Sequence, residues 1–378
     1  MKKSVTVIVL IFLLLFIVVA TNRVKAEHED AYEQHYSEEI ARGKVLSVID
    51  QSISEADEHM GFVGRQLVEV EIISGEYRGL TKQTENILPG NPRYDILVSE
   101  GDEVLLVVGE EEGIIKTYIT DFIRDRGLLI MLLLFIGVLV FVGGWRGIKS
   151  LFSLVITVVV LFKVLLPLVL RGYNPLPLTV VAAAVLIVII LLIIGGWNKK
   201  TWAAIIGTAG GVLLAGLLAI YFGEWVNLTG LSTDEAQMLL HLGDTELDFR
   251  GVLFAGMIVG ALGAIMDVGM SIASTLEEVK KGNPLLDLSQ LFTAGMNVGR
   301  DIMGTMTNTL ILAYVGGTMP LIMLLMSFQP SFLRIINMDL ISTEVVRALA
   351  GSIGLVFCIP LTAFIAAFLF STFEDDAC

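Results

Sequence analysis

The sequence predicts a polytopic α-helical membrane protein with a small exported β-rich domain near its N-terminus. Of its 378 residues, 55% are hydrophobic and only 17% are charged, and the mean hydropathy is +0.78. Soluble domains carry about 45–50% apolar and about 25% charged residues. The apolar residues gather in runs of 16 or more, long enough or nearly long enough to cross a bilayer core of ~30 Å. The net charge of −14 resides in residues 27–126, which hold 23 acidic and 9 basic side chains.

Residues 1–26 have the pattern of an export signal. Lys2 and Lys3 precede an apolar run from Val5 to Ala20, and a loosely fitting small-residue cleavage site ends at Ala26. The segment is either a cleaved signal peptide or an uncleaved signal anchor. Basic residues between the run and Ala26 are unusual for a cleavage region, which favours the anchor. In both cases the following segment is exported.

Residues 27–124 form an acidic domain whose second part has the pattern of strands. Short alternating apolar runs predict about five strands, with Gly, Pro and Asp in the turns between them. The predicted strands are 44–49, 66–73, 96–98, 104–108 and 114–119. Such a series is typical of a small β-barrel or sandwich, and we expect an OB-like arrangement. This domain has no cysteine, so it has no disulfide framework.

Residues 125–378 form the transmembrane domain, with seven more apolar runs. The predicted helices are 128–144, 150–170, 178–196, 202–223, 251–273, 302–327 and 348–371. This makes eight helices, or seven if the first run is cleaved. Basic residues near positions 2, 146, 199 and 280 fall on alternate connections, so the positive-inside rule places both termini inside and the β-rich domain outside. Gly-Gly-Trp occurs at 143–145 and at 195–197, either as two similar interfacial anchors or as a duplicated helical hairpin.

Composition and motifs exclude several classes of function. The acidic balance argues against nucleic acid as a partner. Motifs for nucleotide hydrolysis or for soluble hydrolases are absent, and we expect neither a cofactor nor a metal centre. His28 and His35 would share a helical face among acidic residues, but a solvated acidic linker explains them better than a cation site.

The predicted helix 251–273 carries one ionisable residue inside its apolar run. Gly256, Gly260 and Ala264 are spaced by four, a pattern that lets another helix approach closely. Asp267 lies in the inner third of this run. A carboxylate there should face protein or a water-filled cavity.

A second polar group follows after a short inner connection. Residues 285–299 predict an amphipathic helix in the inner interface. A straight helix from there to residue 326 would be about 63 Å long at 1.5 Å per residue, so we expect a break near Gly299–Gly304. The polar residues around that break are Asn297, Arg300, Asp301, Thr305 and Asn308. All of these except Arg300 share one helical face by their spacing, and Arg300 is placed to pair with an aspartate. The alternative is an interfacial ion pair without further function.

The stretches Gly263–Ala273 and Gly295–Leu310 closely resemble the YibE/F family of bacterial multi-pass membrane proteins. The resemblance runs from about residue 125 to 371, and the exported domain fits the family's layout. It implies a location in the bacterial cytoplasmic membrane and directs attention to Asp267, Asn297, Arg300, Asp301 and Asn308. It names no substrate.

Two functions compete on this sequence. In the first, the protein is a secondary transporter or permease, with Asp267 and Asp301 binding a proton or cation and the remaining polar residues lining a site for a small solute or ion. In the second, it is a membrane scaffold or regulator whose exported domain binds a membrane or envelope partner. A membrane-embedded enzyme lacks a nucleophile or metal set to complete a mechanism. The expected partners are therefore the lipid bilayer, a solute or ion, and another protein, which includes a second copy of this chain.

Overall fold

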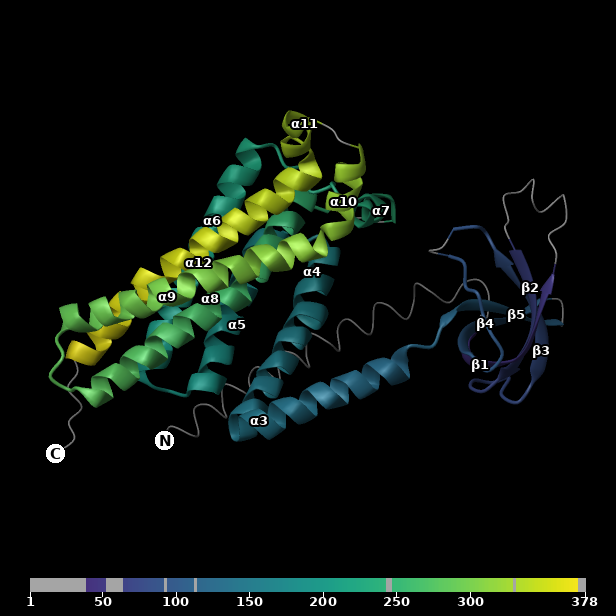
Figure 1. The fold of residues 1–378 in the computed structure, drawn as a ribbon, viewed down its shortest axis with the longest axis horizontal. Coiled ribbons are helices and arrows are strands. Elements are labelled where there is room, and N and C mark those ends of the chain that lie inside the picture. Colours follow the sequence, from purple (N-terminus) through teal and green to yellow (C-terminus); the bar gives the residue numbers. More distant parts are fainter. Residues whose placement is uncertain are drawn as a thin grey trace. The chain divides into compact units, whose positions relative to one another are not determined.

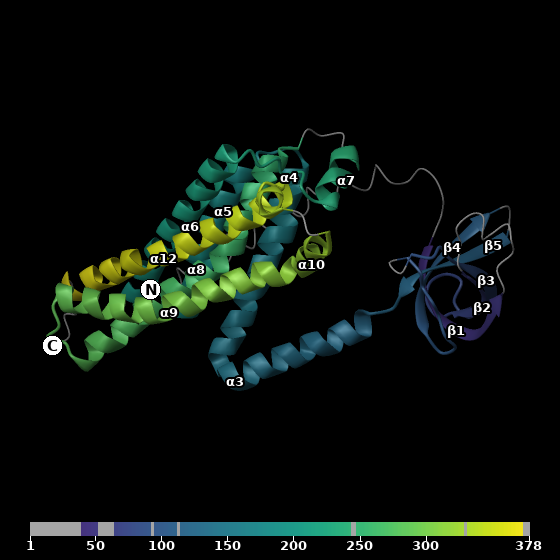
Figure 2. The same cartoon turned by 45° about the horizontal axis from the view of Figure 1, so that its top comes forward.

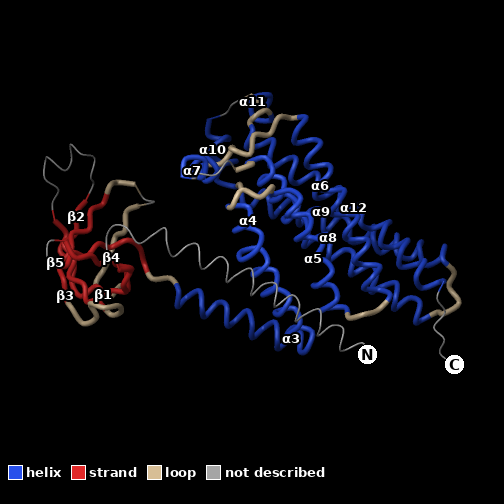
Figure 3. Tube along the Cα trace, turned by 180° about the vertical axis from the view of Figure 1, so that it is seen from behind, coloured by secondary structure: helices blue, strands red, loops and turns tan. Residues whose placement is uncertain are grey.

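The structure is a computed structural model that describes residues 39–51, 64–91, 94–111, 114–242, 247–328 and 331–372. The described residues divide into two compact units, one up to Phe141 and one from Val142 onward. Among the described residues, strands occur only in the first unit, and helices make up the second (Figure 1, Figure 3). The predicted first helix, the cleavage region and the pair His28 and His35 lie outside the described residues.

Five antiparallel strands form the β-domain. They are β1 (Glu39–Gln51), β2 (Gly64–Ile72), β3 (Thr81–Leu88), β4 (Glu103–Glu111) and β5 (Ile114–Phe122), in the order β3-β2-β1-β4-β5. The register shifts between Val45 and Ser47, an irregularity of the kind that bends a strand. The two outer strands approach each other, and the Thr84 hydroxyl donates to the Thr117 carbonyl. The predicted barrel-like domain is therefore confirmed as a near-closed sheet.

One predicted strand is wrong. Residues 96–98 belong to no strand, and the missing strand is β3. Its two inward positions are Thr84 and Asn86, which are buried although they are polar. A strand whose buried positions are polar shows no apolar alternation, so the pattern of the sequence could not reveal it.

The helical part begins at Asp125. Its elements are α3 (Asp125–Val159), the π-helical turn η1 (Val160–Leu165), α4 (Leu166–Leu170), α5 (Pro175–Gly195), α6 (Lys199–Trp225), α7 (Asp234–Leu242), α8 (Phe249–Gly282), α9 (Leu288–Gly317), α10 (Met319–Phe328), α11 (Phe332–Ile336) and α12 (Asp339–Thr372). Among the described residues, five helical segments are long and apolar enough to cross a membrane, or six if α9 and α10 are one bent span. The chain is thus a helical membrane protein.

The predicted runs 128–144 and 150–170 fall within one of these segments, Asp125–Leu170. Its backbone leaves helical geometry at Gly144, where φ is 52° and ψ is −131°. The second glycine of the other Gly-Gly-Trp, Gly196, also has positive φ, at 77°, and ends α5. Each motif therefore uses its second glycine to end a helical stretch, because positive φ is open to glycine and strained for other residues.

The predicted break at Gly299–Gly304 is wrong. Helix α9 runs without interruption through both glycines, and the chain bends by 65° between α9 and α10. Gly299 is packed against α12, where an added Cβ would lie 2.1 Å from Ile359 Cγ2. Its small size serves close packing, and the bend falls where Gly316 and Gly317 precede Pro320, whose ring disfavours a continuing helix.

Helices α6, α8 and α12 form the centre of the helical unit, and α9 lies along α12 (Figure 2). Where α6 meets α12, Gly211 and Gly354 are in backbone contact, since a Cβ on Gly211 would lie 2.8 Å from the Gly354 carbonyl oxygen. Small residues at such crossings let helices pack closely without a side chain between them.

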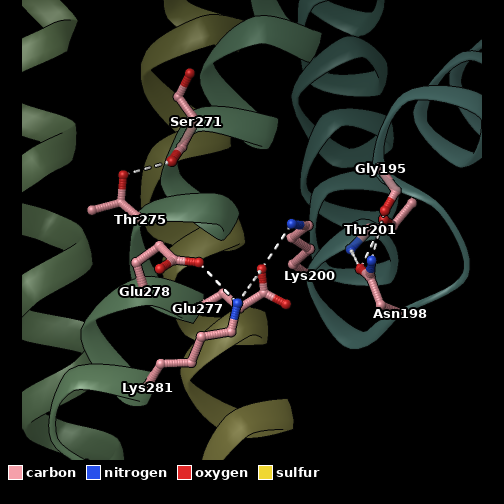
Figure 4. Close-up of polar contacts among 9 residues, drawn as sticks. All are labelled: Gly195, Asn198, Lys200, Thr201, Ser271, Thr275, Glu277, Glu278 and Lys281. Atoms are coloured by element: carbon pink, nitrogen blue, oxygen red, sulfur yellow. Dashed lines mark hydrogen bonds and ion pairs between the residues drawn. The ribbon is translucent and has the colours of Figure 1, made fainter. Parts of the chain in front are cut away.

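The connections α5–α6 and α8–α9 lie at the same end of these helices. Lys200 Nζ at the start of α6 is 2.7 Å from Glu277 Oε2 near the end of α8, and Lys281 also contacts this carboxylate at 3.5 Å (Figure 4). Asn198 caps α6 by accepting from the Thr201 amide at 2.9 Å. The two basic connections that the positive-inside rule assigned to one side are thus neighbours.

Candidate functional site

One exposed stripe of α8 carries Asp267. We call the exposed residues Gly256, Gly260, Gly263, Asp267 and Ser271 the α8 strip. A Cβ added at Gly256 or Gly263 would meet nothing within 4 Å, and Ala264 beside them is half-buried against the core. The close approach predicted around Gly256 therefore does not occur within the described part of this chain. Of the three glycines in the α8 strip, only Gly260 would bring a Cβ within 4 Å of another helix, at Tyr314.

Asp267 is isolated from other charges along α8. The nearest ionisable residues on this helix are Arg250, 17 positions before it, and Glu277, 10 positions after it. At 1.5 Å per residue these intervals are about 25 Å and 15 Å, so Asp267 lies within the apolar stretch. Among the described residues it has no hydrogen bond or ion pair. A lone ionised side chain at such depth costs about 2.5–3.5 kcal/mol on insertion scales.

Helix α9 presents its polar residues on one exposed side. We call Asn297, Arg300, Asp301, Thr305 and Asn308 the α9 polar face, and all five are exposed. The opposite side of α9, with Gly295 and Gly299, is buried against α12. Because α9 is continuous, the four residues predicted to share a face do so. Arg300 Nη1 donates to Asn297 Oδ1 at 3.4 Å, and Arg300 makes no ion pair with Asp267 or Asp301 in the described structure.

Two contacts set α8 against α9. A Cβ on Gly260 would lie 3.2 Å from Tyr314 Oη, and one on Gly295 would lie 3.0 Å from Leu276 Cδ1. The helices therefore run antiparallel, and Asp267, between Gly260 and Leu276, is level with the stretch from Asp301 to Asn308. The α8 strip and the α9 polar face lie at the same level on two contacting helices, and we take them together as the candidate site.

Two hydroxyls near this site were missed by sequence reasoning. Thr307 Oγ1 and Tyr314 Oη are buried and have no hydrogen-bond partner among the described residues. They are seven positions apart on α9, so they point in nearly the same direction. That spacing, with Arg300 seven positions earlier, is the signal that could have added them to the predicted group.

An apolar groove of about 530 Å³ lies between α9, α10, α11 and α12. Its one charged lining residue is Glu344, whose Oε1 accepts from Arg347 Nη1 at 2.6 Å. An apolar lining with an already paired carboxylate does not suit a polar solute, although Tyr314, which contacts Gly260 of the α8 strip, also lines this groove. Across the described residues, no group of three or more His, Cys, Asp or Glu side chains is close enough to hold a metal ion.

Comparison with known families covers both parts of the chain. A family model described as YibE/F-like protein matches residues 131–372, and one described as YibE/F family N-terminal domain matches residues 30–122. No curated protein and no solved structure matches the chain.

Proposed function

The chain belongs to the YibE/F family, and from this premise we propose that it is a secondary transporter or permease of the bacterial cytoplasmic membrane. In this proposal the α8 strip and the α9 polar face line the solute path. Both termini lie inside and the β-domain lies outside, as the distribution of basic residues favours.

The observation that carries the proposal is the unpaired carboxylate of Asp267 at the level of the α9 polar face. A helix that only needed to span lipid would place an apolar residue there, because an ionisable one is costly. Carriers accept this cost where the charge binds the transported or coupled ion. Gly260 and Leu276, on either side of Asp267, both contact α9. Asp267 therefore lies at the level of amide and carboxylate side chains of α9.

Each side chain has a role in this scheme. Asp267 and Asp301 bind a proton or cation and release it on the other side. Arg300 offers a guanidinium to an anionic group of the solute, a geometry suited to carboxylate or phosphate. Asn297 and Asn308 supply amide donors and acceptors on the same face.

The test is flux into proteoliposomes over a panel of solutes and ions, with wild type, Asp267→Asn and Asp301→Asn. We expect a flux that is present in the wild type and reduced at least tenfold in Asp267→Asn, with both proteins inserted equally. Full activity in both Asn variants would reject this role for the two aspartates.

A second function is favoured by the surface of the β-domain. Ile40, Leu97 and Ile114 are 68%, 63% and 63% exposed, and in this alternative they contact the partner protein. In this alternative the protein is a scaffold or regulator and the polar residues of α8 and α9 only hold helices together. Leu97→Ser and Ile114→Ser would then abolish function in cells, whereas Asp267→Asn would act only through stability.

A further inference from the structure

We propose that the α8 strip and the α9 polar face form an interface with a second copy of this chain, in which Arg300 of each copy pairs with Asp267 of the other. This pairing uses the same Asp267 and Arg300 that the proposed function assigns to ion and solute, so ion or solute binding would have to break it, and its test uses a readout other than flux. It rests on which side chains are uncovered within the membrane-spanning helices and on what could cover them.

Asp267 and the α9 polar face are uncovered in the described chain. Asp267 and all five residues of the α9 polar face are exposed, although α8 and α9 pass the length and apolarity criteria for membrane spans, α9 together with α10. Among the described residues Arg300 donates a hydrogen bond to Asn297 alone, and Asp267 has no hydrogen bond or ion pair. Lipid tails offer such groups neither hydrogen bonds nor counter-charges, so they face protein or water, and the proposal assigns them to protein.

Two apolar segments of the chain itself lack the groups that Asp267 and Arg300 need. Residues 5–20 and 128–142 contain no charged or amide side chain. Either segment could cover apolar surface, but neither could pair with Asp267 or Arg300. The occupant must bring a cation to Asp267 and an anion to Arg300.

A second copy meets both needs at once. Under two-fold symmetry the same surface of both copies meets. The Asp267 carboxylate of each copy can then face the Arg300 guanidinium of the other. The face carries Asp267 on α8 and both Arg300 and Asp301 on α9, so charges of both signs lie on neighbouring helices. An interface between two copies therefore forms the pair twice.

The shape of the face fits close helix contact. A Cβ at Gly256, Gly263 or Gly304 would meet nothing within 4 Å, so these backbones are open on the side of the proposed partner. Small residues at such positions let membrane helices approach closely, which compensates for the absence of a hydrophobic driving force in lipid. The glycines that pack inside the chain, such as Gly211 and Gly299, are different ones.

The test is crosslinking of a Gly304→Cys variant by a short bismaleimide in native membranes. A band at twice the chain mass of 41.1 kDa is expected. Leu217→Cys is the matched control, because Leu217 is 63% exposed on α6, away from the proposed interface. The wild type gives the background from its own two cysteines, Cys358 and Cys378. Crosslinking of Gly304→Cys no stronger than that of Leu217→Cys would overturn the interface.

Charge reversal then tests the pair. In the Gly304→Cys background, Asp267→Arg alone and Arg300→Asp alone should each lower crosslinking at least fivefold, since each creates two like-charge contacts. Differently tagged copies of these two variants, expressed together, should crosslink to each other at close to the unmodified level, because both pairs are then restored. Asp267→Asn and Arg300→Gln serve where a reversed charge prevents insertion, and each should lower crosslinking to a smaller degree.

The mixed expression separates contacts between copies from contacts within one chain. If the pair forms within a chain, the mixed copies stay uncrosslinked while the double variant Asp267→Arg/Arg300→Asp recovers, and this result would contradict the proposal. The readout is independent of flux, so a protein that dimerises but moves no solute would leave the interface standing and remove the transporter.

Discussion

Tyr314 of α9 lies beside Gly260 of α8, with its hydroxyl oxygen 3.2 Å from where a Cβ on Gly260 would be. This contact fixes the register of the two helices whose exposed sides carry the candidate site. It also buries the tyrosine hydroxyl where no described group accepts or donates a hydrogen bond.

Replacing Tyr314 by Phe should therefore not lower stability. A buried hydroxyl without a partner costs about 1–3 kcal/mol of desolvation, and its removal recovers part of that cost. Thermal unfolding in detergent should show a melting temperature equal to or above that of the wild type. A clear decrease would mean that the hydroxyl has a partner, such as a bound solute or a second copy.

Gly299→Ala should destabilise the helical unit. The new methyl would lie 2.1 Å from Ile359 Cγ2, and Ile359 is itself buried and has little room to move. Overpacking of this kind costs about 1–3 kcal/mol. Gly137→Ala in α3 is the control, because nothing lies within 4 Å of that position and alanine is the better helix former. Equal melting temperatures for the two variants would contradict the packing of α9 on α12.

The ion pair between Lys200 and Glu277 should couple α6 to α8. Both side chains are about one-fifth exposed, so solvent screens the pair in part, and we expect a coupling free energy of about 0.5–1 kcal/mol in a double-mutant cycle of Lys200→Met and Glu277→Gln. Glu278→Gln is the control, since Glu278 contacts Lys281 and is well exposed. A coupling free energy of zero would show that the ion pair does not stabilise the contact between α6 and α8.

Asn86→Ala should loosen the segment before β4. The Asn86 amide donates to the Ile96 carbonyl at 2.6 Å and to Gln66 Oε1 at 3.1 Å. Losing the first bond leaves the part-buried Ile96 carbonyl without this donor, at about 1–3 kcal/mol, whereas Gln66 Oε1 still accepts from the Val98 amide. Amide hydrogen exchange in residues 94–100 should become faster, while the exposed neighbour Gln83→Ala leaves it unchanged. Unaltered exchange in the Asn86 variant would mean that other contacts hold this segment.

Much of the helical fold could be predicted because each membrane-spanning helix contains a long apolar run. An apolar run of about 20 residues has few structures open to it in a membrane, so α5 and α6 lie close to their predicted bounds, while α8 and α12 contain the predicted runs and extend beyond them. The misplaced break shows that an apolar run does not reveal the role of a glycine within it. A glycine in a helix is compatible with a break or with close packing, and only the neighbour, Ile359 in the case of Gly299, decides between them.

The candidate site was predictable as a spacing but not as a set of contacts. Intervals of four, four and three place Asn297, Asp301, Thr305 and Asn308 on one side of any continuous helix. Whether Arg300 meets Asp267 depends on the rotation of α8 and α9 about their axes, which no single-chain pattern encodes. The strand β3 was missed for a related reason, since Thr84 and Asn86 point inward because of the partners they find there.

The most direct test of the account is the dissipation of an imposed pH gradient in proteoliposomes, measured for wild type, Asp267→Asn and Asp287→Asn, with the solute panel added outside. Asp287 is an exposed acid that caps the start of α9, and asparagine is an equally good cap, so this variant matches the charge change without touching the candidate site. We predict dissipation with wild type and Asp287→Asn and at least a tenfold slower rate with Asp267→Asn. Equal rates for all three proteins would contradict the assignment of Asp267 as the ion-binding group.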